Sequence, residues 1–221
     1  MKRLLLLVLF SCCLVGRARP MGDGEELFSV DSSGIFRTNP AAVLPFYALP
    51  EGRPEWQTVG DVPLAGMPEY RVRLDAFEDP DAGFNSITIL RGEKELLCLR
   101  SADMWTYLYD GKCMIDLRRF ADNRCFIQEK LTDDLTLLIF VGWPYASDPS
   151  LLTIVALSGD EAEVVYNRYA DIVHLFRAGA LFGIDVRKAV IEYDEHGTPC
   201  NDGTPCRIFY ANGCLREVSR R

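Results

Sequence analysis

The chain has 221 residues, of which 48% are hydrophobic and 25% are charged. This balance excludes a disordered tail, a collagen-like fibre and a coiled-coil rod, and the length suits one domain or at most two small ones. The formal net charge is −8 and the basic residues are scattered along the chain. Such a surface repels the phosphates of nucleic acids, so we expect no nucleic-acid partner.

Residues 1–18 have the pattern of a secretory signal peptide. Lys2 and Arg3 precede an apolar run from Leu4 to Val15. This run is too short to cross the ~30 Å hydrocarbon layer as a helix, but it matches the apolar region of a secretory signal. No later run is long enough to span a membrane, so we expect no transmembrane segment. Removal of the leader takes away three basic residues and no acidic one, which moves the net charge from −8 to −11.

The leader offers two alternative cleavage sites. Small residues at Gly16 and Ala18 suit a signal peptidase that cuts after Ala18. The segment from Leu9 to Cys12 resembles a bacterial lipobox, in which Cys12 would become the lipidated N-terminal residue. We favour soluble export, secreted or periplasmic, because lipidation at Cys12 would shorten the apolar run. A lipid anchor at the cell envelope is the alternative.

Residues 19–68 are rich in Pro and Gly and have little hydrophobic periodicity. The part from 40 to 68 holds six of the twelve prolines, which cannot donate the hydrogen bonds of a sheet. We predict short strands at 27–30 and 35–37 and otherwise an irregular arm. Three aromatic residues are expected to pack this arm on the surface of the domain: Phe46, Tyr47 and Trp56.

From residue 69 to the end at 221, the pattern is that of an antiparallel β domain. Apolar and charged residues alternate from Tyr70 to Ala76, which is typical of a strand with one face in water. Residues 135–141 and 151–157 are continuously apolar, which predicts central strands covered on both faces. Segment 169–180 fits either a helix or a strand. Further short strands are predicted at 87–90, 125–128, 162–166, 189–193 and 207–210.

The order of these strands contains a weak internal repeat. Three times, a strand is followed by a long loop, an apolar strand, a tight glycine-containing turn and a further strand. The three loops are 79–85, 142–149 and 195–205. The recurrence favours an all-β fold like a small or partial β-propeller, with a β-sandwich as the alternative. Ordinary hairpins of an antiparallel protein would give the same pattern.

If the repeat is real, the three loops lie at one end of the sheet and form a rim. Aromatic rings and carboxylates on such a rim suit a glycan or a protein ligand, because rings stack on sugars and carboxylates accept hydrogen bonds from hydroxyl groups. The candidate ligand-binding residues are Asp79, Asp81, Trp143, Tyr145, Asp148 and Asp202, and His196 lies on the same loops. The alternative is that Pro and Asp occur there only because they form turns.

Six of the eight cysteines remain after the leader is removed. Cys200 and Cys206 flank an Asn-Asp-Gly turn, so in an oxidising compartment we predict a disulfide between them. Free thiols and a metal site are the alternatives. A metal site needs histidines at ligand spacing and only His196 is near, so we predict no metal. Cys98 lies in an apolar run and is expected to be a small core residue.

The sequence lacks the motifs of the common catalytic and cofactor sites. It has two histidines, His174 in an apolar segment and His196 in a turn, and no G-x-S-x-G, H-E-x-x-H, G-x-G-x-x-G or Walker motif. The pattern Asp79-x-Asp81-x-Gly83 lacks the later acidic ligand of a calcium loop, so a turn explains it better. We therefore expect no catalytic residue and no cofactor.

These observations favour an exported, non-catalytic module that binds a glycan or a protein through the three loops. One alternative is a glycosidase-like hydrolase, which requires two facing carboxylates in a pocket, one of them with a raised pKa. With 32 acidic residues, the sequence does not select such a pair. The other alternative is a purely structural envelope protein whose acidity serves solubility.

Overall fold

The computed structural model describes residues 24–30, 36–52, 54–108, 115–143, 150–179, 181–188, 192–193, 199–200 and 203–220. Strands make up 67% of this part and helices 4%, which confirms the predicted all-β class. The predicted signal peptide, with both cleavage sites and Cys12, lies outside the described residues. Two short 3₁₀ helices occur in the described part, η1 (Pro40–Ala42) and η2 (Leu117–Phe120).

The strands follow one another closely along the chain. They are β1 (Glu25–Val30), β2 (Phe36–Thr38), β3 (Gln57–Leu64), β4 (Met67–Ala76), β5 (Gly83–Arg91), β6 (Lys94–Thr106), β7 (Ile127–Lys130), β8 (Thr136–Trp143), β9 (Leu151–Ser158), β10 (Glu161–Ala178), β11 (Leu181–Lys188), β12 (Glu192–Tyr193), β13 (Pro199–Cys200), β14 (Thr204–Ala211) and β15 (Cys214–Ser219). Of the strand predicted at 189–193, the structure describes only the part that forms β12.

Thirteen of the described strands form one antiparallel sheet. Its order is β2-β1-β15-β14-β11-β10-β9-β8-β6-β5-β4-β3, with β7 added to β8, and β12 pairs separately with β13. The sheet is open, so neither the predicted propeller-like arrangement nor the sandwich is confirmed. Turn residues and strand periodicity determine which neighbours pair, whereas the closure of a sheet depends on where long strands bend.

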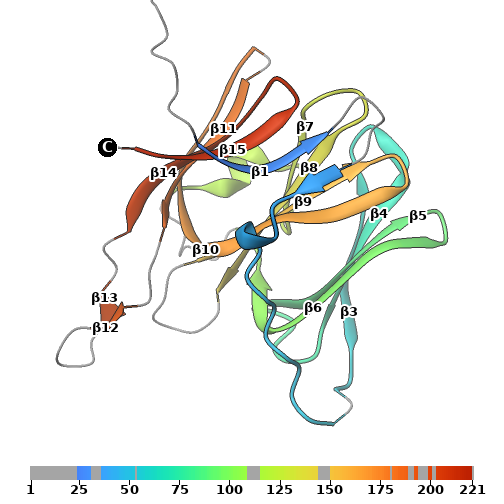
Figure 1. The fold of residues 1–221 in the computed structure, drawn as a ribbon. Coiled ribbons are helices and arrows are strands. Elements are labelled where there is room, and N and C mark those ends of the chain that lie inside the picture. The colour runs from blue at the N-terminus through green and yellow to red at the C-terminus, as the bar shows by residue number, and fades with distance from the viewer. Residues whose placement is uncertain are drawn as a thin grey trace, which may run out of the picture.

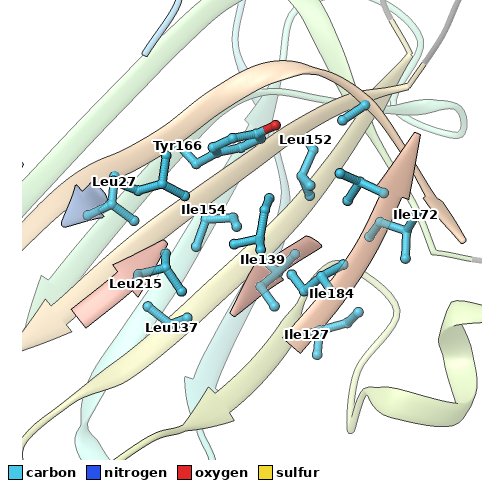
Figure 2. Close-up of a cluster of buried hydrophobic side chains, with 14 of the residues drawn as sticks. Leu27, Ile127, Leu137, Ile139, Leu152, Ile154, Tyr166, Ile172, Ile184 and Leu215 are labelled. Atoms are coloured by element: carbon cyan, nitrogen blue, oxygen red, sulfur yellow. The ribbon is translucent and has the colours of Figure 1, made fainter. Parts of the chain in front are cut away.

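Strands β8 and β9 lie at the centre of the molecule and are buried on both faces. Along β8, Leu137 and Ile139 belong to one hydrophobic cluster, the first core, while Leu138 and Phe140 belong to another, the second core. Figure 2 shows side chains of the first core, including Ile139. Successive side chains of a strand point to opposite faces, so the two cores lie on opposite faces of these strands. The prediction of central strands at 135–141 and 151–157 is thus confirmed.

The two halves of the sheet each cover one of these cores. Strands β10, β11, β14, β15 and β1 contribute side chains to the first core, and β3 to β6 contribute to the second. In Figure 1, β11, β14 and β15 lie on one side of β8 and β9, and β3 to β6 lie on the other. Both faces of the central strands β8 and β9 are therefore covered by other strands of the same sheet.

Strand β10 is the longest strand and takes part in both neighbouring ladders. Residues 161–169 pair with β9, and residues 170–178 pair with β11. Register shifts between Val164 and Tyr166 and between Ile172 and His174 mark β-bulges, which bend a strand. The segment at 169–180 that fitted either a helix or a strand is thus strand as far as residue 178.

The N-terminal arm contains more sheet than we predicted. Besides β1 and β2, it includes β3, which pairs with β4 along its length. We did not predict β3 because it contains Pro63. A proline is tolerated in the last strand of a sheet, where its missing N–H faces no partner strand. Between the strands, Phe46 packs on the second core, Trp56 contacts Phe77, and Tyr47 is 55% exposed.

The first and last described strands are neighbours in the sheet, because β1 pairs with β15. A buried polar network accompanies this seam. The Tyr166 hydroxyl donates a hydrogen bond of 3.0 Å to the Glu217 carboxylate, and Arg168 lies 3.6 Å from the same carboxylate. Arg168 also pairs with Glu25 at 2.9 Å, so β1, β10 and β15 are joined by charged groups as well as by the ladder.

Burial on both faces of β8 leads to a test by truncation. We expect Leu138→Ala and Ile139→Ala each to lower the free energy of unfolding by about 3 kcal/mol, because each removes a fully buried side chain. Strand β4 has one face in water. There, Leu74→Ala should lower the free energy of unfolding by a similar amount, while Arg73→Ala should change it by less than about 0.5 kcal/mol. Urea denaturation measures all four variants, and a neutral result for either β8 variant would contradict the two-core arrangement.

Candidate functional site

The structure describes few of the predicted rim residues. Asp79 and Asp81 lie in the turn before β5, where the Asp79 carboxylate accepts a hydrogen bond of 3.0 Å from the backbone N–H of Asp81. This contact is typical of an Asp that forms a turn. Only the backbone of Trp143 is described, at the end of β8. The remaining predicted residues lie outside the described part: Tyr145, Asp148, His196 and Asp202.

Strand register shows where the three loops leave the sheet. β8 ends beside the start of β9, and Lys188 at the end of β11 lies opposite both Ala170 and Thr204. Ala170 in turn bonds to Ser150 just before β9, so the strand ends that carry the second and third loops are neighbours. β5 and β8 run in the same direction, both antiparallel to β6. The start of β5 and the end of β8 lie on either side of the same end of β6, because Gly83 is opposite Thr106 and Gly142 is opposite Trp105.

The predicted disulfide between Cys200 and Cys206 is not formed in the structure. Cys206 is a free thiol, 1% exposed, and its side chain points from β14 into the first core. Cys98 is only partly buried, so its assignment to the core was wrong. Cys98 is on β6 opposite Thr88. In the part of the chain that the structure describes, no group of three His, Cys, Asp or Glu side chains is placed to hold a metal ion.

The described residues form an apolar pocket of about 200 Å³ at one end of the first core. We call it the Phe pocket. Its wall comes from η2, β7 and the hairpin of β10 and β11, and consists of Phe120, Ile127, Glu129, Leu175, Phe176, Arg177 and Phe182. Ile127, Leu175 and Phe182 also belong to the first core, so the pocket opens directly onto the hydrophobic interior.

A glycine positions the Phe176 ring, which lies on the face of the hairpin opposite the core-facing Leu175 and Phe182. Gly183 pairs with Phe176 across the hairpin, and a Cβ atom at Gly183 would lie 2.2 Å from the Phe176 ring. The ring therefore lies over the bare backbone of β11, and any larger residue at 183 would displace it. The guanidinium of Arg207 lies 4.5 Å from the centre of the same ring, a cation–π distance.

The polar atoms of the pocket are already paired with each other. Arg177 donates to the Glu129 carboxylate through its Nε at 2.8 Å and again through Nη2. Arg177 also reaches the backbone carbonyl of Lys130 at 3.5 Å. At the mouth, Phe120 is 38% exposed. The pocket therefore offers a ligand mainly aromatic and aliphatic surface.

A second, much smaller cavity surrounds Asp103 on β6. Its volume of about 10 Å³ holds at most one water molecule. Leu44 to Tyr47 of the arm cover it, and Asn167 of β10 lines it. The Asp103 side chain is buried, its Oδ2 atom has no hydrogen-bond partner, and burial raises the pKa of its carboxyl group to about 6.

The carboxylates of the two cavities bear on the hydrolase alternative. The Phe pocket contains Glu129 alone, already paired with Arg177, and the small cavity contains Asp103 alone. Neither of these described cavities holds the two facing carboxylates that glycosidase chemistry requires. Asp103 has the raised pKa of a general acid but lacks both the partner and the space for a substrate.

Sequence analysis missed both cavities. The wall of the Phe pocket comes from three segments far apart in the chain, so no local motif marks it. The one local signal was Gly183, a glycine inside an apolar strand, which indicates a close approach to the backbone. Asp103 falls in a strand with alternating polar residues, where an inward-facing acid looks like an outward-facing one.

Comparisons with models of protein families, with curated proteins and with solved structures find no match to this chain. Within the described residues, no helix is long and apolar enough to cross a membrane.

Asp103 leads to a prediction about stability and pH. Its pKa is raised from 3.8 to about 6, so the folded protein retains a proton that the unfolded chain releases at lower pH. The contribution of this group to the free energy of unfolding is therefore present below a pH of about 4 and is lost as the pH rises through about 6. We expect Asp103→Asn to raise the free energy of unfolding by about 2 kcal/mol at neutral pH and to change it little below a pH of about 4.

Urea denaturation across this range measures the effect. Asp61→Asn is the matched control, because the Asp61 side chain on β3 is half exposed. The assignment of a raised pKa to Asp103 would be contradicted if Asp103→Asn raised the free energy of unfolding equally at low and at neutral pH. It would also be contradicted if Asp61→Asn showed the same dependence on pH.

Proposed function

We propose that this chain is an exported, non-catalytic binding protein whose Phe pocket receives an apolar side chain of a protein ligand. The observation that carries the proposal is the pocket itself, an apolar opening in the first core that is lined by Phe120, Ile127, Leu175 and Phe182. Aromatic side chains in a pocket supply most of the binding energy of many protein interfaces. The leader-like residues 1–18 support the proposed export.

The size and lining of the pocket favour a protein ligand over a glycan. A volume of about 200 Å³ lies below the ~300 Å³ at which pockets for small molecules begin. A sugar also requires several free polar groups, whereas the Glu129 and Arg177 side chains are paired with each other. A single apolar side chain fits the small volume and needs no free polar group, while the rest of the ligand lies outside the pocket.

The neighbouring strand supports an extended ligand. Among the described residues, β7 pairs only with β8, so its other edge has no strand partner. Ile127 and Glu129 of the same strand line the pocket. Proteins that bind peptides at a sheet edge combine main-chain hydrogen bonds along the edge with a pocket for a side chain. The arrangement around β7 offers both features.

Phe120 provides the test of this proposal. We expect Phe120→Asp to weaken binding of a peptide selected from a displayed random library by at least tenfold, because it places a charge at an apolar mouth. Fluorescence polarisation with the labelled peptide measures the affinity.

Leu44→Asp is the matched control, since Leu44 is 39% exposed and Phe120 38%, and Leu44 lies on the arm away from the pocket. Equal melting temperatures for both variants and the parent show that the fold is unchanged. A selection that yields no peptide dependent on Phe120 would overturn the proposal.

A further inference from the structure

Residues 44–47 of the N-terminal arm cover a carboxyl group that is poorly satisfied in the folded protein. They form one wall of the small cavity around Asp103. Asp103 is only 4% exposed, and its Oδ2 atom makes no hydrogen bond. Since the cavity holds at most one water molecule, the carboxyl group loses most of its hydration there. Such a place favours the neutral carboxyl group over the charged carboxylate.

Hydrogen bonds at its two ends hold this segment on the sheet. The Leu44 N–H donates to the Asn167 carbonyl of β10 at 2.8 Å, and the Asn167 side-chain amide donates to the Leu44 carbonyl at 2.8 Å. At the other end, the backbone N–H of Ala102 on β6 donates to the Tyr47 carbonyl at 3.1 Å. The Tyr169 hydroxyl also donates to the Tyr47 hydroxyl at 3.2 Å. The segment therefore spans the cavity from β10 to β6.

The arm is the wall of the cavity that opens most easily. The other walls come from β6, β9 and β10, which are paired strands of the large sheet. Residues 44–47 lie outside any strand, and Leu44 and Tyr47 are 39% and 55% exposed. Segments with few buried contacts and solvent-exposed backbone open at the lowest cost in free energy. Water therefore reaches Asp103 most readily by movement of the arm.

We propose that residues 44–47 act as a lid, which is closed over Asp103 while its carboxyl group is protonated and opens more often once the proton is lost. Opening hydrates the carboxylate and so relieves the cost of a charge in the cavity. It also removes the Phe46 ring from its contact with Trp105, where the ring centres are 5.8 Å apart. An aromatic surface beside a carboxylate then becomes accessible. This inference goes beyond the proposed function, because Phe46 packs on the second core and the Phe pocket opens onto the first.

The lid responds over the pH range in which Asp103 titrates. Burial beneath the closed lid raises the pKa of the Asp103 carboxyl group from 3.8 to about 6, and opening returns it to its ordinary value. Its contribution to the closed form is therefore present below a pH of about 4 and is lost as the pH rises through about 6. A difference of about two pH units increases the equilibrium constant for opening by up to about a hundredfold. Of the residues that line the cavity, Tyr47 and Tyr169 are also titratable, and tyrosine is uncharged in this range.

Amide hydrogen exchange, followed by NMR on the intact protein, tests this lid. The amide protons of Leu44 and Ala102 report on it, because each is bonded across the junction between the arm and the sheet. We expect their protection factors, corrected for the intrinsic exchange rate, to fall at least tenfold between a pH of about 4.5 and one of about 7.5. The Asn39 amide is the matched control within the arm, because it is bonded to the Leu27 carbonyl, away from the cavity, and should show no such fall.

Asp103→Asn and low concentrations of urea identify the cause of the exchange. Asparagine has the same shape as protonated Asp but no charge, so this variant should keep the high protection of Leu44 and Ala102 at both pH values, whereas Asp61→Asn should behave like the parent. Local opening exposes little surface and is insensitive to urea, whereas global unfolding is sensitive. Exchange of Leu44 and Ala102 should therefore stay unchanged in low urea, while exchange of Ile154 at the centre of the sheet accelerates.

Three results would each overturn the lid. One is protection of Leu44 and Ala102 that does not change with pH in the parent, a result that needs no variant. Another is the same fall with pH in Asp103→Asn, because Asp103 would then not be the group that titrates. The last is exchange of Leu44 and Ala102 that accelerates in urea as much as that of Ile154, because the arm would then open only when the whole protein unfolds.

Discussion

Strands β8 and β9 have hydrophobic side chains on both faces, and each face must be covered by another part of the chain. The described parts of these strands are almost entirely apolar, and their side chains alternate between the first and second cores. Burial of apolar surface is the main favourable contribution to folding, so both faces need a protein layer. The chain meets this requirement with the two ends of its single sheet, which explains why the sheet is long and open.

The bend of β10 creates the Phe pocket in this arrangement. Because residues 170–178 leave β9 and pair with β11, the far end of the first core lies between the β10–β11 hairpin and β7. The edges of the hairpin and β7 do not pair with each other in the described structure, and the Arg177–Glu129 contact bridges them instead. The Phe pocket is therefore a product of how the sheet covers its centre.

The sequence allowed prediction of those features that a few neighbouring residues determine. The two central strands could be predicted because continuous apolar runs have no other explanation in a sheet. β3 was missed because Pro63 argues against a strand unless its position at the sheet edge is known. The path of the sheet depends on bulges in β10, whose residues look ordinary in the sequence. The Phe pocket joins three distant segments, so only a folded structure could reveal it.

The pairing of β1 with β15 has a consequence for how the chain acquires its structure. Strands β3 to β6 pair mainly with their neighbours in sequence, so this half can assemble from local hairpins as the polypeptide emerges. The other half waits for the C-terminus, since Glu217 must reach Arg168 and Glu25 before its seam can close. Until the last strand has been synthesised, β1 has only β2 as a partner and the chain stays incompletely folded.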